Sequence, residues 1–296
     1  MRWSSLSYGT FVLIHASHVR TCLVIGAGLP KSTICTTINK VCASGMKSVI
    51  LASQMIQCGG LENSRDAVLA GGFESMSNVP HYLMSSRSGI PLGNSQLIDG
   101  VIHDGLWDIY NNQHMGMCAE KCATDYSISR EEQDFYAIES YKRAHKYIES
   151  GIFSSEIENV SIPQKRGDSL VVDSDEEPFG VDLEKMSTLR PAFDRKNGTV
   201  TAANASSLND GAAAMVLMSE GSALELGLKP LARVLSSGEA AQDPVDFTTS
   251  PSLAVRVASK NAGIDLSDIE YHEINEAFSV VVSIWIDDAY LYIYCF

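Results

Sequence analysis

The sequence predicts an α/β protein, and three neighbouring segments carry that prediction. Residues 36–39 are β-prone, and from Cys42 apolar residues recur mostly at three- and four-residue spacing, which is typical of a helix that ends at the glycine pair 59–60. Residues 67–70 form a second short apolar run, which ends at another glycine pair. Residues 33–72 are therefore expected to form a β-α-β unit with a parallel pair of strands.

The segment just before this unit raises the alternative of a dinucleotide-binding fingerprint. Residues 23–28 read LVIGAG, like the end of a strand that enters a glycine turn. Lys31 stands where the third glycine belongs, Pro30 interrupts the phosphate-binding turn, and no acidic residue precedes Glu62 to hold a ribose. A structural turn is therefore the prediction for this segment.

The chain between residues 80 and 199 differs in kind from the segment before it. It contains many turn-forming residues, one amphipathic helix pattern at residues 130–150, and a charged stretch at residues 173–177. We expect a large inserted loop domain there. The small, turn-forming residues 198–214 then lead into an apolar strand at residues 214–218, and such a loop lets backbone groups approach a ligand closely.

The charge of the chain limits its partners. The 296 residues carry 36 acidic and 22 basic side chains, which gives a formal net charge of −14. A protein with this charge repels a phosphate backbone, so we expect no nucleic-acid partner. Residues 1–61 contain no Asp or Glu, and an anion-accepting surface is therefore expected near the N-terminal third.

The cysteines and the N-terminal residues bear on the compartment. Seven scattered cysteines form no dense disulfide framework, so a reducing compartment is expected. His15 and His18 interrupt the apolar run at residues 11–14, which predicts neither a signal peptide nor a membrane span. The acid-free start, with Arg2, Arg20 and several serines, has some features of a mitochondrial transit segment.

Cys42 is the candidate nucleophile, because the pattern places it where a strand turns into a helix. The unpaired N–H groups and the positive dipole end of a helix stabilise a thiolate and also an oxyanion. The small residues Ala43, Ser44 and Gly45 leave room for a substrate. The alternative interpretation is that Cys42 is a small buried apolar residue.

Five motifs, in their order along the chain, resemble those of thiolases. Their residues are most similar to those of the mitochondrial-type acetyl-CoA acetyltransferases. They are TTINKVCASGMKS at residues 36–48, AGGFESMSNVP at 70–80, HMGMCAE at 114–120, NGTVTAANASSLNDGAAA at 197–214 and NEAF at 275–278. Together they extend from about residue 26 to about residue 280. The resemblance implies a layered αβαβα thiolase fold with an inserted loop domain.

The resemblance also implies an activity. Cys42 would attack the thioester carbonyl of acetyl-CoA to give an acetyl-enzyme, and a carbanion from a second acetyl-CoA would then form acetoacetyl-CoA, or the reverse thiolysis would occur. The Cys42 backbone N–H would be one oxyanion donor, and Asn275 would position a water at the other oxyanion site. The alternative for Asn275, not exclusive of this role, is an N-terminal helix cap before Glu276 and Ala277.

The family pattern further implies residues that contact coenzyme A and a potassium ion. Residues expected to contact coenzyme A are Tyr141, Val181, Asp182, Lys185 and Ser206, with His114 and Met115 lining the tunnel near the thioester. The close relatives carry a basic residue where this chain has Gly180, so the resemblance implies no phosphate contact from the side chain at position 180. Potassium would be bound by Tyr141 and by the backbone carbonyls of Ala202, Ala203 and Ala205. A homotetramer and a mitochondrial location, with the cytoplasm as alternative, are also implied.

Two apparent metal motifs do not hold. Cys118 and Cys122 lie one helical turn apart without a matching second pair, so zinc is not expected. The dipeptide His272-Glu273 resembles the start of a zinc-protease motif, but Glu276 stands where the second histidine belongs. No transition metal is therefore expected.

The two ends depart from the family pattern. The resemblance starts near Gly26 and stops beyond Val282, and the family's Gly-His-Pro and Cys-x-Gly-Gly-Gly motifs are missing from these 296 residues. By the resemblance, the histidine of the first motif activates the nucleophile, and the cysteine of the second deprotonates the second substrate. We expect a partial N-terminal thiolase domain at residues 1–80, a loop domain at 81–199, a return to the first domain at 200–228, and a truncated C-terminal domain at 229–296. The alternative function is thus a catalytically incomplete thiolase fragment that at most binds coenzyme A or a full-length subunit.

Overall fold

The structure, a computed structural model, describes residues 11–15, 25–59 and 67–288. The chain divides into two compact units: residues 1–105 with 208–237, and residues 106–207 with 238–296. Arg2 and Arg20, on which the expectation of a transit segment depends, lie outside the described residues, as do Gly60 and Cys295.

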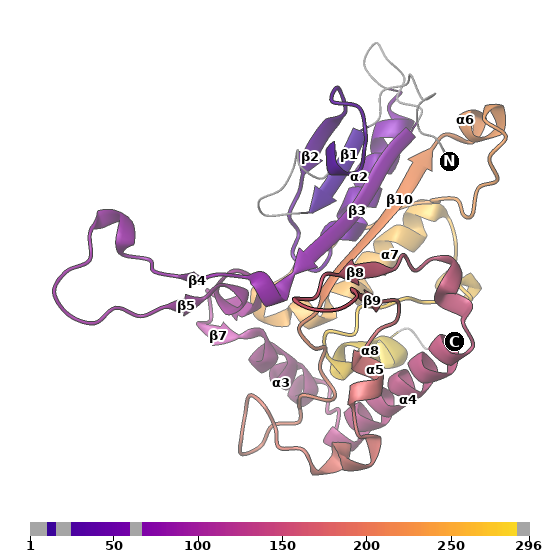
Figure 1. Cartoon of the computed structure of the whole chain (residues 1–296). Coiled ribbons are helices and arrows are strands. Elements are labelled where there is room, and N and C mark those ends of the chain that lie inside the picture. Colours follow the sequence, from indigo (N-terminus) through magenta and orange to yellow (C-terminus); the bar gives the residue numbers. More distant parts are fainter. Residues whose placement is uncertain (1–10, 16–24, 60–66, 289–296) are drawn as a thin grey trace. The chain divides into compact units, whose positions relative to one another are not determined.

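The first unit is built on a four-stranded sheet with the order β10-β3-β1-β2 (Figure 1). Its strands are β1 (Phe11–His15), β2 (Ile34–Thr37), β3 (Ala67–Ser75) and β10 (Asp210–Met218). β1 runs parallel to both β2 and β3, whereas β10 runs antiparallel to β3. The predicted α/β class is confirmed.

The predicted pairing of the two strands that flank the helix is wrong. β1 lies between β2 and β3 and pairs with both of them, so β2 and β3 are not hydrogen-bonded to each other. The crossover from β2 through the helix to β3 therefore skips one strand. The apolar run at residues 11–14, considered above as a possible signal peptide, forms β1, an inner strand of the sheet. Local patterns cannot show which distant segment enters a sheet.

Helix α2 (Ser44–Gln57) packs against β3 and β1 of this sheet (Figure 1). Ala52, Val68 and Ala70 are fully buried between the helix and β3. Full burial of a side chain such as Val68 stabilises the fold by about 1.5–3 kcal/mol. The helix ends where predicted, since Gly59 takes a φ of +57° that favours glycine.

Strand β3 does not stop at Gly71 and Gly72 as predicted but continues to Ser75. A Cβ on Gly71 would lie 2.4 Å from the carbonyl oxygen of Ala213 on β10, so only glycine permits this close approach of the two backbones. These glycines therefore mark close packing inside a strand, not a strand end.

The turn predicted at residues 23–28 is present in its described part. Leu23 and Val24 lie outside the described residues, so the expected strand end is not tested there. Ile25 and Gly26 are helical rather than extended, and Gly28 has a φ of +74° and donates its N–H to the Ile25 carbonyl at 3.0 Å.

An arm at residues 81–99 extends from the first unit (Figure 1). The short strands β4 (His81–Tyr82) and β5 (Ile98–Asp99) pair antiparallel at its base. Along the chain, the 3-10 turn η2 (Met76–Asn78) precedes β4, the 3-10 turn η3 (Ser86–Ser88) lies between β4 and β5, and the π-helical turn η4 (Ile102–Leu106) follows β5. Its large exposed apolar residues are Met84, Ile90, Leu92 and Leu97. Beyond β10, the first unit also contains α6 (Glu220–Glu225).

The second unit is mainly helical. Its helices are α3 (Met115–Asp125), α4 (Arg130–Glu149), α5 (Glu177–Gly180), α7 (Ser250–Ala262) and α8 (Ser279–Asp288), with the 3-10 turns η5 (Ile152–Ser155), η6 (Leu183–Thr188), η7 (Pro244–Thr249) and η8 (Leu266–Asp268). Two short antiparallel pairs complete it, β6 (Trp107–Asp108) with β7 (Gln113–His114) and β8 (Val160–Ile162) with β9 (Leu170–Val172).

The core of the second unit joins α3 and α8. Its buried residues come from α3, from Ile128 and Val200, and from the segment that begins α8, where Val280 and Ile284 are almost fully buried. The helix predicted at residues 130–150 is confirmed as α4, and Ser129 and Glu132 form a capping box at its start. Within the described ranges, none of the helices has the length and apolar composition of a membrane-spanning segment.

Candidate active site

Cys42 lies in the turn that joins β2 to α2 in the first unit. The N–H of Ala43 donates to the Lys40 carbonyl, and the N–H of Ser44 donates to the Val41 carbonyl, both at 3.1 Å. The Cys42 thiol is exposed and forms no disulfide. A reagent or substrate can therefore reach its sulfur, and the alternative of a buried apolar cysteine is wrong.

The residue before Cys42 has an unusual backbone conformation. Val41 has a φ of +49°, which a β-branched residue rarely adopts and which costs about 1–3 kcal/mol. The Val41 N–H donates to Asn39 Oδ1 at 2.8 Å. This side-chain contact offsets part of the strain and fixes the backbone one residue before the thiol.

Ser44 stabilises the same turn from the helix side. Its hydroxyl donates to the Val41 carbonyl at 2.7 Å and accepts the Lys40 N–H at 2.8 Å, and the residue is only 2% exposed. The sequence analysis treated Ser44 as a small neighbour only. Its position at the first residue of the helix was a signal for capping contacts that the sequence reasoning did not use.

The start of α2 is electrostatically suited to an anion. Its N-cap residue, Ala43, makes no side-chain cap hydrogen bond, and the first turn of this fully described helix contains no acidic residue. The helix dipole therefore favours negative charge beside Cys42, either on the thiolate or on an oxyanion formed by a substrate.

The first turn of α2 rests closely on β3. A Cβ on Gly72 would lie 3.3 Å from Cα of Gly45, and the Ser48 hydroxyl donates to the Gly71 carbonyl at 3.1 Å. This contact holds the helix start, and with it Cys42, against the strand.

His114 and Met115 lie at the start of α3 in the second unit. His114 is the N-cap residue, and its Nδ1 accepts the Gly116 N–H at 3.0 Å. Its ring stacks on Phe193 with centroids 4.7 Å apart. Burial lowers the pKa of His114, so the ring is neutral near pH 7, as acceptance at Nδ1 requires. Met115 is half-buried beside it.

Three of the predicted ligand-binding residues share one small cluster. Tyr141 of α4 and Val181 pack against the buried group of Ala137, Met186 and Ala203. Burial, and then the nearby Glu177, raise the pKa of Tyr141. The structure therefore brings Tyr141, Val181 and Ala203 together although they are distant in the sequence.

Lys185 and Asp182 lie on the exposed side of the same segment. The Lys185 ammonium forms an ion pair with Asp182 at 2.5 Å, and their side chains are 74% and 50% exposed. The hydrogen bond to Asp182 raises the pKa of Lys185, which is therefore charged at neutral pH. A phosphate that binds Lys185 must share it with Asp182.

The loop at residues 201–206 contacts the segment that contains Asn275. The Ser206 N–H donates to the Ala277 carbonyl at 3.0 Å, and the Ser279 N–H donates to the Asn204 carbonyl at 2.9 Å. Ser206 and Asn275 are both exposed. α8 begins only at Ser279, so the interpretation of Asn275 as a helix cap is wrong.

Two buried carboxylates, both missed by the sequence reasoning, hold this loop and the two residues just before it. Glu120 accepts the N–H groups of Thr199 and Val200 at 2.8 and 3.0 Å. Asp134 accepts Asn204 Nδ2 at 2.9 Å and Arg130 Nε at 2.7 Å. An acidic residue at an otherwise apolar position of a helix was the available signal.

Glu276, in the NEAF motif, was also missed. Its two carboxylate oxygens accept hydrogen bonds from Tyr136 at 2.5 Å and from Ser140 at 2.7 Å, both on α4. These contacts fix the residue next to Asn275. The spacing of Tyr136 and Ser140 places them on one helix face, but nothing in the sequence identifies Glu276 as their partner.

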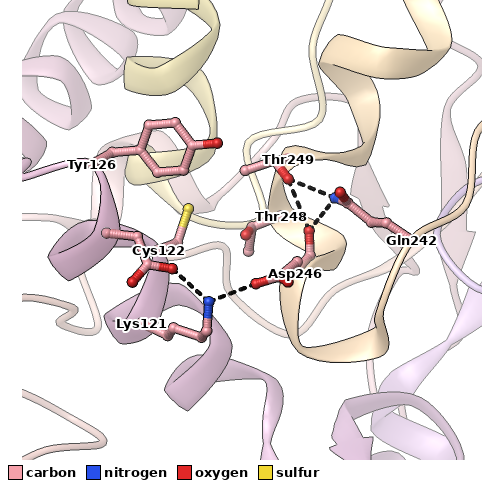
Figure 2. A pocket seen from close by; sticks show the side chains of 8 residues that line it. Lys121, Cys122, Tyr126, Gln242, Asp246, Thr248 and Thr249 are labelled. Atoms are coloured by element: carbon pink, nitrogen blue, oxygen red, sulfur yellow. Dashed lines mark hydrogen bonds and ion pairs between the residues drawn. The ribbon is translucent and has the colours of Figure 1, made fainter.

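A polar cavity of about 380 Å³ lies in the second unit, and Figure 2 shows its side chains. It is lined by Lys121, Cys122, Asp125, Tyr126, Gln242, Asp246, Thr248 and Thr249, none of which the sequence reasoning selected. Lys121 pairs with both Asp125 and Asp246, at 2.5 and 2.7 Å. Burial raises the pKa of the Cys122 thiol to about 11, so this thiol is neutral and unreactive. The cavity thus lies between α3 and η7, which are linked by the ion pair of Lys121 and Asp246.

The residues predicted to act together fall into different units. Cys42 belongs to the first unit, whereas Asn275 and the residues implied for coenzyme A and potassium belong to the second. Among the described residues, no three His, Cys, Asp or Glu side chains are grouped so that they could hold a metal ion.

An α/β sheet that presents an exposed cysteine at a helix start defines a class of protein suited to nucleophilic chemistry through a thiolate. The family profile described as "Thiolase, N-terminal domain" matches residues 15–221, and that described as "Thiolase, C-terminal domain" matches residues 228–289. The chain belongs to the thiolase family, a family of acyltransferases that includes the acetyl-CoA acetyltransferases.

Curated relatives support this assignment. An acetyl-CoA acetyltransferase from Schizosaccharomyces pombe is 54% identical over 258 residues, which cover 87% of this chain and 64% of the relative. Acetyl-CoA acetyltransferase 1 from Arabidopsis thaliana is also 54% identical, with 87% and 61% covered. A mitochondrial acetyl-CoA acetyltransferase from Bos taurus is 51% identical, with 88% and 60% covered. The chain thus spans less than two thirds of the length of these relatives.

A solved structure shows the same fold. A thiolase from Ascaris suum, determined in complex with coenzyme A, is 42% identical and superposes with a TM-score of 0.88 over 96% of this chain and 73% of that one. This similarity confirms the thiolase-like fold that the motifs imply.

Proposed function

We propose that the chain acts as an acetyl-CoA C-acetyltransferase in which Cys42 accepts the acetyl group. The single observation that carries this proposal is the exposed Cys42 thiol at the uncapped, acid-free start of α2. The names of the relatives point to the same reaction.

In the acylation step, Cys42 Sγ, as the thiolate, attacks the carbonyl carbon of the thioester. The carbonyl oxygen takes up negative charge, which the Cys42 N–H and the dipole of α2 stabilise. The bond between this carbon and the sulfur of coenzyme A then breaks, and coenzyme A leaves as a thiolate. The acetyl group remains on Cys42.

In the condensation step, a base takes a proton from C2 of a second acetyl-CoA, a role that the resemblance gives to the cysteine of the Cys-x-Gly-Gly-Gly motif. The resulting carbanion attacks the acetyl carbon. The bond to Cys42 Sγ breaks, and acetoacetyl-CoA is released. Asn275 is proposed to position a water at the second oxyanion site. Its neighbour Glu276 is fixed by hydrogen bonds from Tyr136 and Ser140 of α4, which limits the movement of Asn275. Thiolysis of acetoacetyl-CoA is the same sequence in reverse.

The second unit is proposed to bind coenzyme A through Tyr141, Val181, Asp182, Lys185 and Ser206, with His114 and Met115 near the thioester. The common cluster of Tyr141 and Val181, and the exposed ammonium of Lys185 beside them, support this assignment. The relative solved with coenzyme A supports the choice of ligand.

A potassium ion is proposed to stabilise the loop at residues 201–206. The donor set fits, because carbonyl oxygens suit a hard cation and Ala203 packs with Tyr141 in one cluster. Tyr141 and the carbonyls of Ala202, Ala203 and Ala205 would hold the ion, which would supply positive charge beside the loop.

We further propose that the chain forms a homotetramer, as the resemblance to the thiolase family implies, and that it is located in mitochondria. The exposed apolar residues of the arm, such as Leu92, support association with other copies. The mitochondrial relatives support the location.

The acylation step can be tested on its own. After incubation of the 296-residue chain with acetyl-CoA, intact-mass spectrometry should show one added acetyl group, and peptide mapping should place it on Cys42. Cys42→Ala should abolish the adduct, whereas Cys58→Ala, at the other end of α2, should retain it. An unmodified chain, or an adduct that persists in Cys42→Ala, would refute the proposal.

Binding of coenzyme A has a separate test. Lys185→Ala should weaken coenzyme A in a calorimetric titration because a phosphate loses its charged partner. Lys196→Ala, which removes another exposed lysine of the same unit, is the control. Unchanged affinity in Lys185→Ala would mean that the assignment of this segment is wrong.

A further inference from the structure

An exposed aromatic pair lies beside the proposed coenzyme A residues in the second unit. Phe179 of α5 stacks on His145 of α4, with ring centroids 4.8 Å apart and planes 9° apart. Phe179 is nevertheless 50% exposed. One face of its ring therefore lies on His145, and the other is accessible to a ligand.

The stack is held in place by more than the contact of the two rings. His145 Nε2 donates to the carbonyl of Pro178, the residue just before Phe179. α5 contains only four residues, so this bond and the stacking contact, rather than the helix itself, fix the ring of Phe179. The ring is thus presented in a defined orientation (Figure 1 shows α5 beside α4).

The chemistry around the stack suits an adenine nucleotide. Tyr141, one helical turn before His145 on α4, and Val181, which follows Phe179 by two residues, pack against the same buried cluster. Lys185, 74% exposed, lies on the next turn, and α4 adds the exposed Lys142 and Lys146. A flat aromatic face with nearby cations matches a planar base that carries phosphates, and aromatic side chains bind bases by stacking.

We propose that the free face of Phe179, supported from behind by His145, stacks on the adenine ring of coenzyme A. This inference rests on the proposed function and adds two residues to the proposed site. The proposal also explains why this chain can have Gly180 where its close relatives have a basic residue. Stacking on Phe179 supplies affinity for adenine without a charged side chain at position 180, and Gly180 has no side chain that could cover the ring.

Titrations with the two halves of coenzyme A, the adenine nucleotide and the phosphopantetheine arm, distinguish a stacking role of Phe179 from a general loss of structure at the binding site. Calorimetric titrations of the full chain should use coenzyme A, 3′-phosphoadenosine 5′-phosphate and 4′-phosphopantetheine. Phe179→Ala should weaken the first two by about 5- to 150-fold, the range expected when one stacked base loses its aromatic partner, and should leave 4′-phosphopantetheine unchanged. Phe179→Trp should retain the affinity for both adenine ligands. His145→Leu should weaken the adenine ligands less than Phe179→Ala does.

Phe135→Ala is the matched control, because Phe135 is 69% exposed on α4 but lies near the opposite end of that helix. It should change none of the three affinities. Equal weakening of all three ligands by Phe179→Ala would overturn the stacking role, as would unchanged affinity for coenzyme A. If the unaltered chain binds neither coenzyme A nor the nucleotide, the proposed function fails together with this inference. Binding that is insensitive to Phe179 overturns the inference alone.

Discussion

Two exposed cysteines flank one helix, and their positions make Cys42 distinctive at the scale of single residues. Cys42 precedes the start of α2, whereas Cys58 is the C-cap residue of the same helix. The helix dipole favours negative charge at its N-terminus and disfavours it at its C-terminus. Both thiols are exposed to solvent. A difference in their reactivity therefore reflects the different electrostatic potentials at the two ends of the helix.

We therefore expect Cys42 to react with iodoacetamide about 3- to 10-fold faster than Cys58 in the folded chain. Cys118 and Cys122 should react more slowly than both, because burial raises the pKa of each of these thiols. Limited labelling followed by peptide mass spectrometry measures all four rates. Equal labelling of Cys42 and Cys58 would show that α2 does not activate the thiol.

The hydroxyl of Ser44 is expected to control the same reactivity. Ser44→Ala removes the contacts to Lys40 and Val41 and should slow the labelling of Cys42 several-fold, with a loss of stability of about 1–3 kcal/mol. Ser48→Ala is the control, since Ser48 is also buried on α2 but bonds to Gly45 and Gly71 instead. It should destabilise the chain without changing the rate at Cys42. Equal rates in the two variants would count against a positioning role for Ser44.

His114 predicts a pH dependence of stability. Burial lowers its pKa in the folded chain, so the unfolded chain binds the proton more readily, and the free energy of unfolding should fall as the pH drops below the ordinary histidine value of 6.5. His114→Asn keeps an N-cap acceptor but removes the titration, and should flatten the decline between about pH 7 and pH 5.

Urea unfolding at several pH values measures this slope. The exposed His81→Asn should leave the slope unchanged. Burial also lowers the pKa of His272, so part of the decline should remain in His114→Asn. A slope identical to that of the unaltered chain would contradict the assignment.

At the scale of elements, α3 and α4 act as supports for the loop that follows the inserted segment. Glu120 from α3 and Asp134 from α4 are 8% and 6% exposed and bind the loop backbone or its Asn204 side chain. The amphipathic spacing along residues 130–150 predicted α4, and Ser129 and Glu132 have the spacing of the capping box that the structure shows. Which loop these helices would hold was not predictable, because the contacts join residues about 70 to 80 positions apart.

Glu120→Gln should destabilise the second unit by about 1.5–3 kcal/mol, the range for hydrogen bonds to a charged group. The amide keeps one acceptor oxygen but turns an N–H group toward the N–H groups of the loop, so one of them loses its partner. Glu131→Gln, at an exposed position of α4, should change stability by less than about 0.5 kcal/mol. Urea midpoints compare the two variants, and similar losses would contradict the role of Glu120.

At the scale of the whole molecule, the two half-reactions are expected to separate. The 296 residues contain neither a Gly-His-Pro nor a Cys-x-Gly-Gly-Gly motif, whereas Cys42 and α2 are present. Formation of the carbanion needs a positioned base, which typically contributes about 10²- to 10⁴-fold. The proposed acylation of Cys42, by contrast, would depend on the turn and the helix dipole of the first unit, because the histidine that activates the nucleophile in the family pattern is missing as well.

We therefore expect this chain to take up acetyl from acetyl-CoA while forming acetoacetyl-CoA at a rate about 10²-fold or more below that of an intact relative. Intact-mass spectrometry measures the first step, and the absorbance of the Mg²⁺ complex of acetoacetyl-CoA measures the second. Rapid condensation by a soluble preparation would refute this expectation and would require another residue to act as the base.

The sequence by itself determined the family, the α2 and α4 helices, and the position of Cys42 at a helix start, because each depends on short-range spacing or on contiguous motifs. The tertiary structure decided that β1 enters between β2 and β3, that the glycines of β3 serve close packing with β10 and α2, and that Val41 adopts a left-handed conformation. It also decided that Phe179 rests on His145. These features arise from contacts between residues far apart in the chain, and a pattern with a period of two or four residues carries no information about which distant segments meet.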